Sequence, residues 1–173
     1  MLNLRYWDDP VLSTVCEPVR DSEFGSKLED FGRELISTMV DHNGVGLAAP
    51  QVGVSTRIFA MHFPKGGVSL SPIAVCNPTL QFSGPIVLLQ EGCLSVPEVF
   101  EQVARSQFAT MRYFTLLGEE REVEIRDMDA RIAAHEIDHL DGIMFFDRRR
   151  MSRQMSKALL RKWDKIKYQY VEQ

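Results

Sequence analysis

The sequence of 173 residues carries a net charge of −4, and 45% of its residues are hydrophobic and 25% charged. These proportions are ordinary for one globular domain with a substantial core, and the chain is too short for two ordinary domains. No apolar run approaches the roughly 18 residues of a membrane-spanning helix, and the first residues do not resemble a signal peptide. Three widely spaced cysteines argue against a disulfide framework and for a reducing compartment. We therefore expect a protein of a bacterial-type cytoplasm, or of a host cytoplasm if a phage encodes it, that binds neither membrane nor DNA.

The first half of the chain predicts one helix, a glycine-rich segment and several strands. A helix is expected over residues 26–43, because apolar side chains recur at helical spacing up to Gly44. The segment GVGLAAPQVG, residues 44–53, is too rich in glycine for a regular element. Strands are predicted at 57–63, at 73–83 and at 86–90, with breaks at Asn77-Pro78 and Gly84-Pro85.

The second half predicts a hairpin followed by a helix that carries two histidines. Residues 103–117 and 121–127 are rich in strand-forming residues and flank a GEE turn. A helix over 128–141 would place His135 and His139 on its apolar face, turned into the core. The predicted fold class is α+β: mainly antiparallel sheets packed around a central metal-binding helix, with an N-terminal helix and a C-terminal helix.

The stretch HEIDH at residues 135–139 is the strongest indication of chemistry. Because His135 and His139 lie four residues apart, a helix directs both imidazoles to one side, where they can bind one metal ion. A catalytic metal site normally takes three protein ligands and leaves a fourth position open to water. The pattern is short, so a pair of hydrogen-bonded core histidines is the alternative interpretation.

The third ligand decides the class of metal site. One class of protease takes this ligand from a glutamate well downstream, and here only Glu172 follows Glu136. A second class extends the motif to HExxHxxGxxH, but the final position holds Phe145, which cannot bind a metal. Cys93 in QEGCLSVP is the upstream candidate, because a thiolate and two imidazoles make a sound three-ligand site. By itself, Cys93 would be interpreted as an inert buried thiol.

Together, these motifs resemble those of a known enzyme family. In chain order they are DDPVLSTVCEPV at 8–19, GVGLAAPQVG at 44–53, EGCLSVP at 91–97 and HEIDHLDG at 135–142. They are similar to peptide deformylase, the metal hydrolase that removes the N-formyl group from nascent peptides. The resemblance covers residues 4–147, so residues 1–147 are expected to form a single catalytic domain.

The resemblance implies that Cys93, His135 and His139 bind the metal and that Glu136 is the general acid and base. The family metal is Fe(II), and nickel, cobalt or zinc can occupy the site; the donor set alone suits zinc equally well. The metal would lower the pKa of its bound water, so that hydroxide is available near neutral pH to attack the formyl carbon. Glu136 would take the proton of that water and pass a proton to the leaving amine.

The resemblance also implies contacts to the substrate, a formyl-methionyl nascent peptide. Gln51 and the backbone N–H of Leu94 would donate hydrogen bonds to the formyl oxygen as negative charge develops on it. Backbone groups of Val45 and Gly46 would bind the extended peptide. A glycine-rich segment suits this role, because its backbone can approach the substrate closely.

Three charged residues are expected to support the site. Glu91 and Arg105 resemble the buried ion pair that braces the active-site strand of the family, with two unrelated strand charges as the alternative. Asp138 is expected to make a bracing contact beside the metal ligands, and a solvated helix charge is its alternative.

The sequence departs from the family pattern at three positions. Arg131 stands where the family usually has an aliphatic residue that lines the pocket for the methionine side chain. It could lean out to solvent with only its stem packed, or point inward and alter substrate preference. Ala134 replaces a common glutamine, and Phe100 replaces a common basic residue near the downstream part of the substrate.

Residues 148–173 form a basic tail on an acidic body. They carry nine Lys or Arg and two acids, whereas residues 1–147 carry 11 basic and 22 acidic residues. An amphipathic C-terminal helix is predicted there. Its basic residues could contact ribosomal RNA, as a terminal helix does in some members of the family, or its apolar stripe could simply pack on the body.

Two other classes of function compete with this interpretation. One is a zinc endopeptidase of the HExxH type, which the missing downstream ligand and the presence of Cys93 disfavour. The other is a non-enzymatic module that keeps the fold and binds ribosomes or peptides. Glu136 disfavours that role, since a binding module has no need of a general base.

Overall fold

The computed structural model describes residues 2–62, 71–148, 161, 162 and 164. These residues contain α1 (Ser26–Asp41), α2 (Met128–Leu140) and the strands β1 (Gly46–Ala48), β2 (Ile58–Met61), β3 (Ile73–Cys93), β4 (Val96–Phe114) and β5 (Glu120–Arg126), with short 3-10 helices at Pro10–Ser13, Asp21–Glu23, Ala49–Val52 and Phe145–Arg148. The strands form one antiparallel sheet in the order β1-β2-β3-β4-β5. The α+β fold class predicted from the sequence is confirmed.

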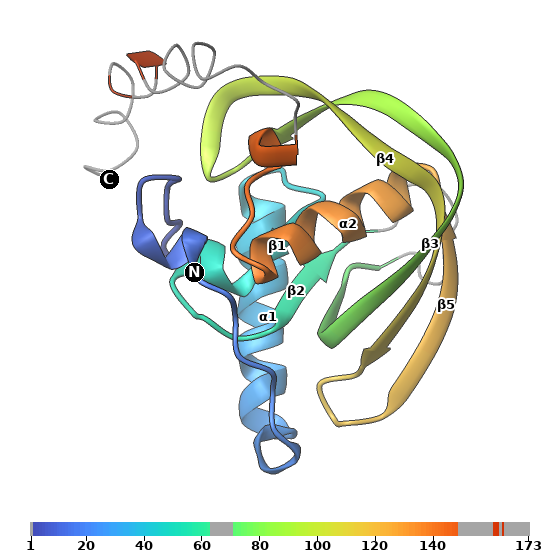
Figure 1. Cartoon of the computed structure of the whole chain (residues 1–173). Helices are drawn as coiled ribbons and strands as arrows, with labels where there is room; N and C mark the ends of the chain where they lie inside the picture. The colour runs from blue at the N-terminus through green and yellow to red at the C-terminus, as the bar shows by residue number, and fades with distance from the viewer. Residues whose placement is uncertain (1, 63–70, 149–160, 163, 165–173) are drawn as a thin grey trace.

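Helix α2 lies inside the curve of the sheet, and α1 lies on the other side of β1 and β2 (Figure 1). Strand β2 is buried on both faces for this reason. Phe59 and Met61 pack in the cluster that contains the apolar residues of α2, whereas Ile58 and Ala60 pack in the cluster that contains those of α1. Because successive side chains of a strand point to opposite faces, an uninterrupted apolar run is what a strand between two helices requires.

Strand β3 is continuous, so the predicted breaks within residues 73–90 are wrong. The register of β3 against β4 shifts between Cys76 and Thr79 and again between Ser83 and Ile86. The Asn77-Pro78 and Gly84-Pro85 pairs fall within these shifts. Asn77 and Gly84 have positive φ angles of 48° and 75°, so the chain accommodates each pair as a bulge and the strand continues.

The β3–β4 hairpin carries Cys93 at its tip. Cys93 pairs with Val96, and the register shifts once more between Gly92 and Cys93. Strand β4 thus begins at Val96, seven residues before the predicted start at 103. The tight end of this hairpin brings Cys93 to the face of the sheet that α2 covers.

The C-terminal helix predicted at 148–173 lies mostly outside the described residues. The structure describes Arg148, Arg161, Lys162 and Asp164 from that stretch. The proposed contact of this helix with ribosomal RNA and its boundary with a domain at 1–147 stay predictions. Within the described part of the chain, no helix has the length and apolar character needed to span a membrane.

Candidate metal centre

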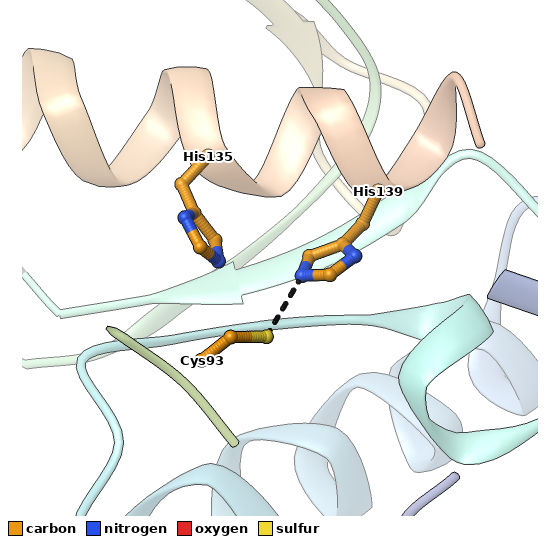
Figure 2. A group of neighbouring side chains, drawn as sticks. All are labelled: Cys93, His135 and His139. Carbon is orange, nitrogen blue, oxygen red and sulfur yellow. Dashed lines mark hydrogen bonds between the residues drawn. The ribbon is translucent and has the colours of Figure 1, made fainter. Parts of the chain in front are cut away.

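The three predicted metal ligands lie together between α2 and the tip of the β3–β4 hairpin. The Sγ of Cys93 and one ring nitrogen each of His135 and His139 all lie within 4.8 Å of one another. Cys93 Sγ is 3.2 Å from Nε2 of His139, and the two imidazole centroids are 5.0 Å apart. Figure 2 shows both rings projecting from α2 toward the cysteine.

This donor set fits a divalent metal ion. Three donors all within 4.8 Å of one another lie close to the spacing that bonds of about 2.0–2.3 Å to a single ion require. Both histidines are buried and Cys93 is half-buried, so few water molecules compete for the donor atoms. That Cys93, His135 and His139 bind a metal remains our proposal.

Phe145 occupies the position where an HExxHxxGxxH site would need its third histidine. Its ring stacks on that of His135, with centroids 5.8 Å apart and planes inclined by 27°. Phe145 is 1% exposed. It therefore forms part of the apolar wall that holds the His135 ring. Because Phe145 has no atom that can bind a metal, Cys93 is the candidate for the third ligand.

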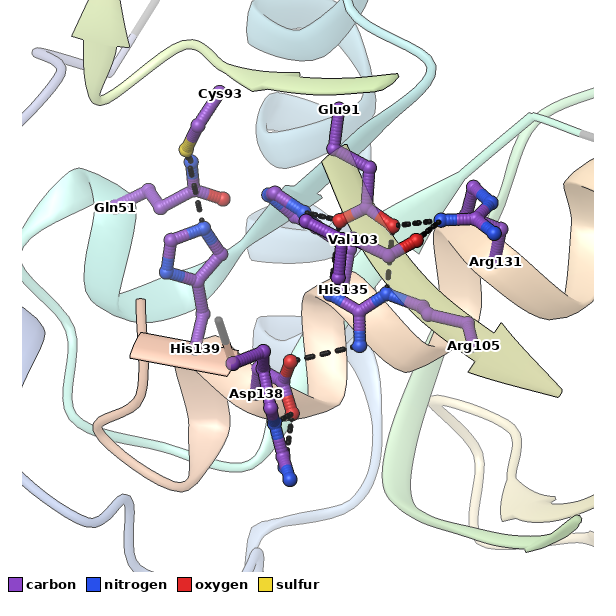
Figure 3. Close-up of polar contacts among 10 residues, drawn as sticks. Gln51, Glu91, Cys93, Val103, Arg105, Arg131, His135, Asp138 and His139 are labelled. Carbon is purple, nitrogen blue, oxygen red and sulfur yellow. Dashed lines mark hydrogen bonds and ion pairs between the residues drawn. The ribbon is translucent and has the colours of Figure 1, made fainter. Parts of the chain in front are cut away.

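Glu91 is a buried carboxylate that connects the hairpin to α2 (Figure 3). Its Oε2 lies 3.0 Å from Nδ1 of His135, and Arg105 donates from Nε to Oε1 at 2.7 Å and from Nη2 to Oε2 at 2.9 Å. Burial would raise the pKa of Glu91, but hydrogen bonds from His135 and Arg105 outweigh burial and lower the pKa to about 2. The ionised carboxylate favours a proton on Nδ1 of His135, which leaves Nε2 free to face a metal.

Asp138 binds the same arginine from the next turn of α2. Its Oδ2 accepts a hydrogen bond from Nη1 of Arg105 at 2.8 Å, and its Oδ1 accepts one from Nη2 of Arg148 at 2.5 Å. The side chain of Asp138 is 4% exposed, so it is not a solvated helix charge. Arg105 thus joins two carboxylates, one on the hairpin and one on the helix.

Arg131 points inward and pairs with Glu91. Its Nη1 lies 2.5 Å from Oε1 of Glu91 and 2.9 Å from the carbonyl oxygen of Val103 (Figure 3). Its Nη2 donates to the carbonyl of Val87 at 2.7 Å. Arg131 is 4% exposed. Of the two orientations that the sequence left open, the structure shows the inward one, with a partner that sequence spacing did not suggest.

Glu136 lies against the backbone of Gly46. A Cβ added to Gly46 would overlap the Glu136 carboxylate, so glycine lets the carboxylate keep this position. Glu136 is 4% exposed, and its Oε2 has no hydrogen-bond partner among the described residues. Burial raises the pKa of Glu136 to about 7. A carboxyl group of this kind can both accept and release a proton near neutral pH.

Gln51 is held in one orientation by hydrogen bonds at both ends of its amide. Its Oε1 accepts a hydrogen bond from the backbone N–H of Ala48 at 2.8 Å, which turns Nε2 toward Ser95 Oγ at 3.2 Å and Cys93 Sγ at 3.4 Å. Ser95 is fully buried, and our sequence analysis did not single it out. Its place two residues after Cys93, inside the EGCLSVP motif, is the signal that could have identified it.

A pocket of about 560 Å³ opens beside the candidate ligands. Its lining includes Val45, Gly46, Leu94, Phe100, Met128 and Arg131. Val45 and Phe100 are 48% and 61% exposed, so the rim of the pocket on these residues is open to solvent. The structure thus gathers the predicted substrate-contacting residues around one opening; their contacts to a substrate stay predictions.

Comparisons with known proteins identify the family of this chain. Residues 1–155 match the family model described as polypeptide deformylase. The chain belongs to this family. It is 39% identical to a peptide deformylase of Thermotoga neapolitana, over 94% of this chain and 93% of that protein.

Solved structures of the family have the same fold. The peptide deformylase of Thermotoga maritima superposes with a TM-score of 0.79 at 39% identity, covering 86% of this chain and 97% of that one. The class I type b peptide deformylase of Acinetobacter baumannii, described with Met-Ala-Ser bound, gives a TM-score of 0.79 at 36% identity, covering 86% and 99%.

Replacing Gly46 by alanine should impair catalysis more than folding. The added methyl group would displace the carboxylate of Glu136, which is the end of a flexible side chain and can move. We expect kcat for formate release to fall at least about tenfold, since displacing Glu136 removes part of the about 10²- to 10⁴-fold that a positioned proton-transfer group contributes. The free energy of unfolding should change by less than about 1.5 kcal/mol. Full activity of Gly46→Ala would show that the position of Glu136 is unimportant.

The three thiols should differ sharply in reactivity. Burial raises the pKa of Cys16 to about 11 and that of Cys76 to about 12, so both remain protonated at pH 8. In the folded, metal-free protein, a thiol-specific chromogenic reagent should therefore modify Cys93 alone. Added Zn²⁺ or Ni²⁺ should protect Cys93, and all three thiols should react after unfolding. Rapid modification of all three in the folded protein would refute this assignment.

Proposed function

We propose that this chain is a metal-dependent hydrolase that removes the N-formyl group from the N-terminal methionine of newly made peptides. The observation that carries the proposal is the cluster of Cys93, His135 and His139 beside a pocket that Cys93, His135 and Glu136 line, in a chain of the polypeptide deformylase family. The tripeptide Met-Ala-Ser, bound to the Acinetobacter baumannii relative, is what removal of formyl from formyl-Met-Ala-Ser would leave.

Cys93, His135 and His139 would hold one divalent ion, which would lower the pKa of a bound water and supply hydroxide near neutral pH. We propose Fe(II) as the native ion, on the basis of the family resemblance. A sulfur and two nitrogens would also hold zinc, nickel or cobalt, so the donor set does not decide the ion.

Glu136 moves the protons of the proposed reaction. Its buried carboxylate takes a proton from the water that attacks the formyl carbon, and delivers a proton to the amine nitrogen as the C–N bond breaks. Its location at the wall of the pocket, against Gly46 and next to His135 in the chain, supports this role. Within the described residues, the buried Oε2 has no hydrogen-bond partner, so its capacity to accept a proton is not taken up by the protein.

Gln51 and Leu94 stabilise the charge that develops on the formyl oxygen. The hydrogen bond from Ala48 to Oε1 of Gln51 leaves the Nε2 donor facing Cys93, on the side where the substrate would lie. Leu94 directly follows Cys93 at the tip of the hairpin, so its backbone N–H lies beside the same ligand. Such preorganised donors lower the barrier because they need not reorient during the reaction.

Val45 and Gly46 offer backbone groups to the peptide that follows the formylated residue. Val45 is 48% exposed at the pocket rim. Gly46 lies close to Glu136, so a peptide bound along this segment would have its first residue next to the proton-transfer group. Extended peptides commonly bind in this way, through main-chain hydrogen bonds to a strand.

Glu136→Gln should separate catalysis from metal binding. The change keeps the size of the side chain but removes its ability to accept a proton, so kcat for formate release from formyl-Met-Ala-Ser should fall by about 10²- to 10⁴-fold. The metal content measured by atomic emission should stay at one equivalent. Glu124→Gln, an exposed carboxylate on β5, is the matched control and should retain full activity. Unchanged turnover in Glu136→Gln would refute the assigned role.

A further inference from the structure

Arg131 lines the pocket beside the candidate metal ligands. It lies on α2 one helical turn, about 5.4 Å, before His135, and it lines the pocket with Met128 and Ile132 of the same helix. The side chain of a substrate's first residue begins three bonds from the formyl carbon. A formyl group bound at the metal site therefore brings that side chain into the neighbourhood of Arg131.

The guanidinium of Arg131 is only partly satisfied by the protein. A guanidinium has five N–H donors, and three of these donate to Glu91 Oε1, Val103 O and Val87 O. The Nε–H and the second N–H of Nη2 have no acceptor among the described residues. Arg131 is 96% buried, since only 4% of it is exposed. Since Arg131 lines the pocket, these N–H groups are available to an acceptor on a bound ligand.

The charges around Arg131 indicate what kind of acceptor fits. Among the buried members of this hydrogen-bonded cluster, Arg131 and Arg105 carry two positive charges and Glu91 and Asp138 carry two negative charges. Arg148 also pairs with Asp138, but its side chain is 46% exposed and water screens its charge. The buried charges are therefore balanced without a ligand. Burying a further carboxylate would add an uncompensated charge, whereas an uncharged oxygen could accept the free N–H groups without that cost.

We propose that Arg131 makes this pocket accept a first side chain that ends in an uncharged hydrogen-bond acceptor, with methionine sulfoxide as the matching residue. This inference rests on the proposed deformylase function. Methionine sulfoxide has the length of methionine and carries an oxygen on the sulfur atom. The free N–H groups of Arg131 donate to that oxygen, so oxidation of the formylated methionine does not exclude the peptide from the pocket.

The test compares formate release from formyl-Met-Ala-Ser, its methionine sulfoxide analogue and formyl-Glu-Ala-Ser. Metal-loaded wild type should hydrolyse the sulfoxide peptide with a kcat/KM within about tenfold of that for the methionine peptide. Arg131→Met removes the donors while keeping an unbranched side chain. This variant should lower the ratio of kcat/KM for the sulfoxide peptide to kcat/KM for the methionine peptide at least about tenfold. Such a decrease is expected when one hydrogen bond from a charged group is lost.

Two control variants separate donation by Arg131 from a general change in the protein. Arg131→Lys retains a charged donor and should give an intermediate ratio. Arg112→Met alters an exposed arginine on β4 and should leave the ratio at the wild-type value. The formyl-Glu peptide should be the slowest substrate of the wild type, because its carboxylate is charged.

The outcomes distinguish failure of this inference from failure of the proposed function. If wild type hydrolyses the methionine peptide but Arg131→Met leaves the ratio unchanged, the role of Arg131 is refuted while the deformylase function stands. Faster hydrolysis of the glutamate peptide than of the sulfoxide peptide would refute the preference for an uncharged acceptor. Release of formate from none of the three peptides would refute the proposed function, and this inference with it.

A second measurement needs no variant. If Arg131→Met fails to fold, this measurement still tests whether the pocket accepts methionine sulfoxide. Calorimetric titration of metal-loaded wild type with Met-Ala-Ser and with its sulfoxide should give dissociation constants within about tenfold of each other. Binding of the sulfoxide product more than about tenfold weaker than the methionine product would contradict the proposal.

Discussion

The carboxylate of Glu91 is the interaction on which the candidate site depends. It is buried, and each of its two oxygens receives two donors: Arg105 and Arg131 at Oε1, and Arg105 and His135 at Oε2. One side chain of the hairpin thereby holds a predicted metal ligand on α2 and two arginines at once. Removing a single partner from such a buried cluster is costly, because a charge is left without compensation. The Cys93 thiol, two residues away, is placed by the same strand.

The fold serves this interaction by bringing two distant segments into contact. Strands β3 and β4 are long, and the bulges in β3 let the sheet curve so that it surrounds α2 (Figure 1). Helix α2 is consequently buried over nearly its whole length, charged side chains included. Buried charges are usually paired, and two of those on α2, Arg131 and Asp138, pair with Glu91 and Arg105 of the hairpin. These buried charges are unusual for a core helix. Their ion pairs with the hairpin fix the position of α2, and with it the position of the two histidines.

Much of the site could be predicted because helical and motif spacing are local properties. The four-residue spacing of His135 and His139 needs only a helix, and that helix is present as predicted. The choice of Cys93 followed from excluding other ligands and from the family resemblance. The strand breaks were wrong because proline and glycine pairs mark turns and bulges alike, and only the partner strand distinguishes them. The contacts of Arg131 with Glu91 and of Ser95 with Gln51 join residues whose separations, 40 and 44 positions, carry no periodic signal.

Metal affinity of a Glu91→Gln variant tests the central claim most directly. Affinity would be measured by competition with a chromophoric chelator, with Glu124→Gln as the control. The amide keeps the shape of the side chain but removes the charge that holds Arg105, Arg131 and the Nδ1–H of His135. Loss of such a support for a metal ligand typically weakens metal binding about 10- to 100-fold, and this is the result we predict for Glu91→Gln alone. Equal metal affinity in wild type and Glu91→Gln would contradict the claim that this carboxylate organises the site.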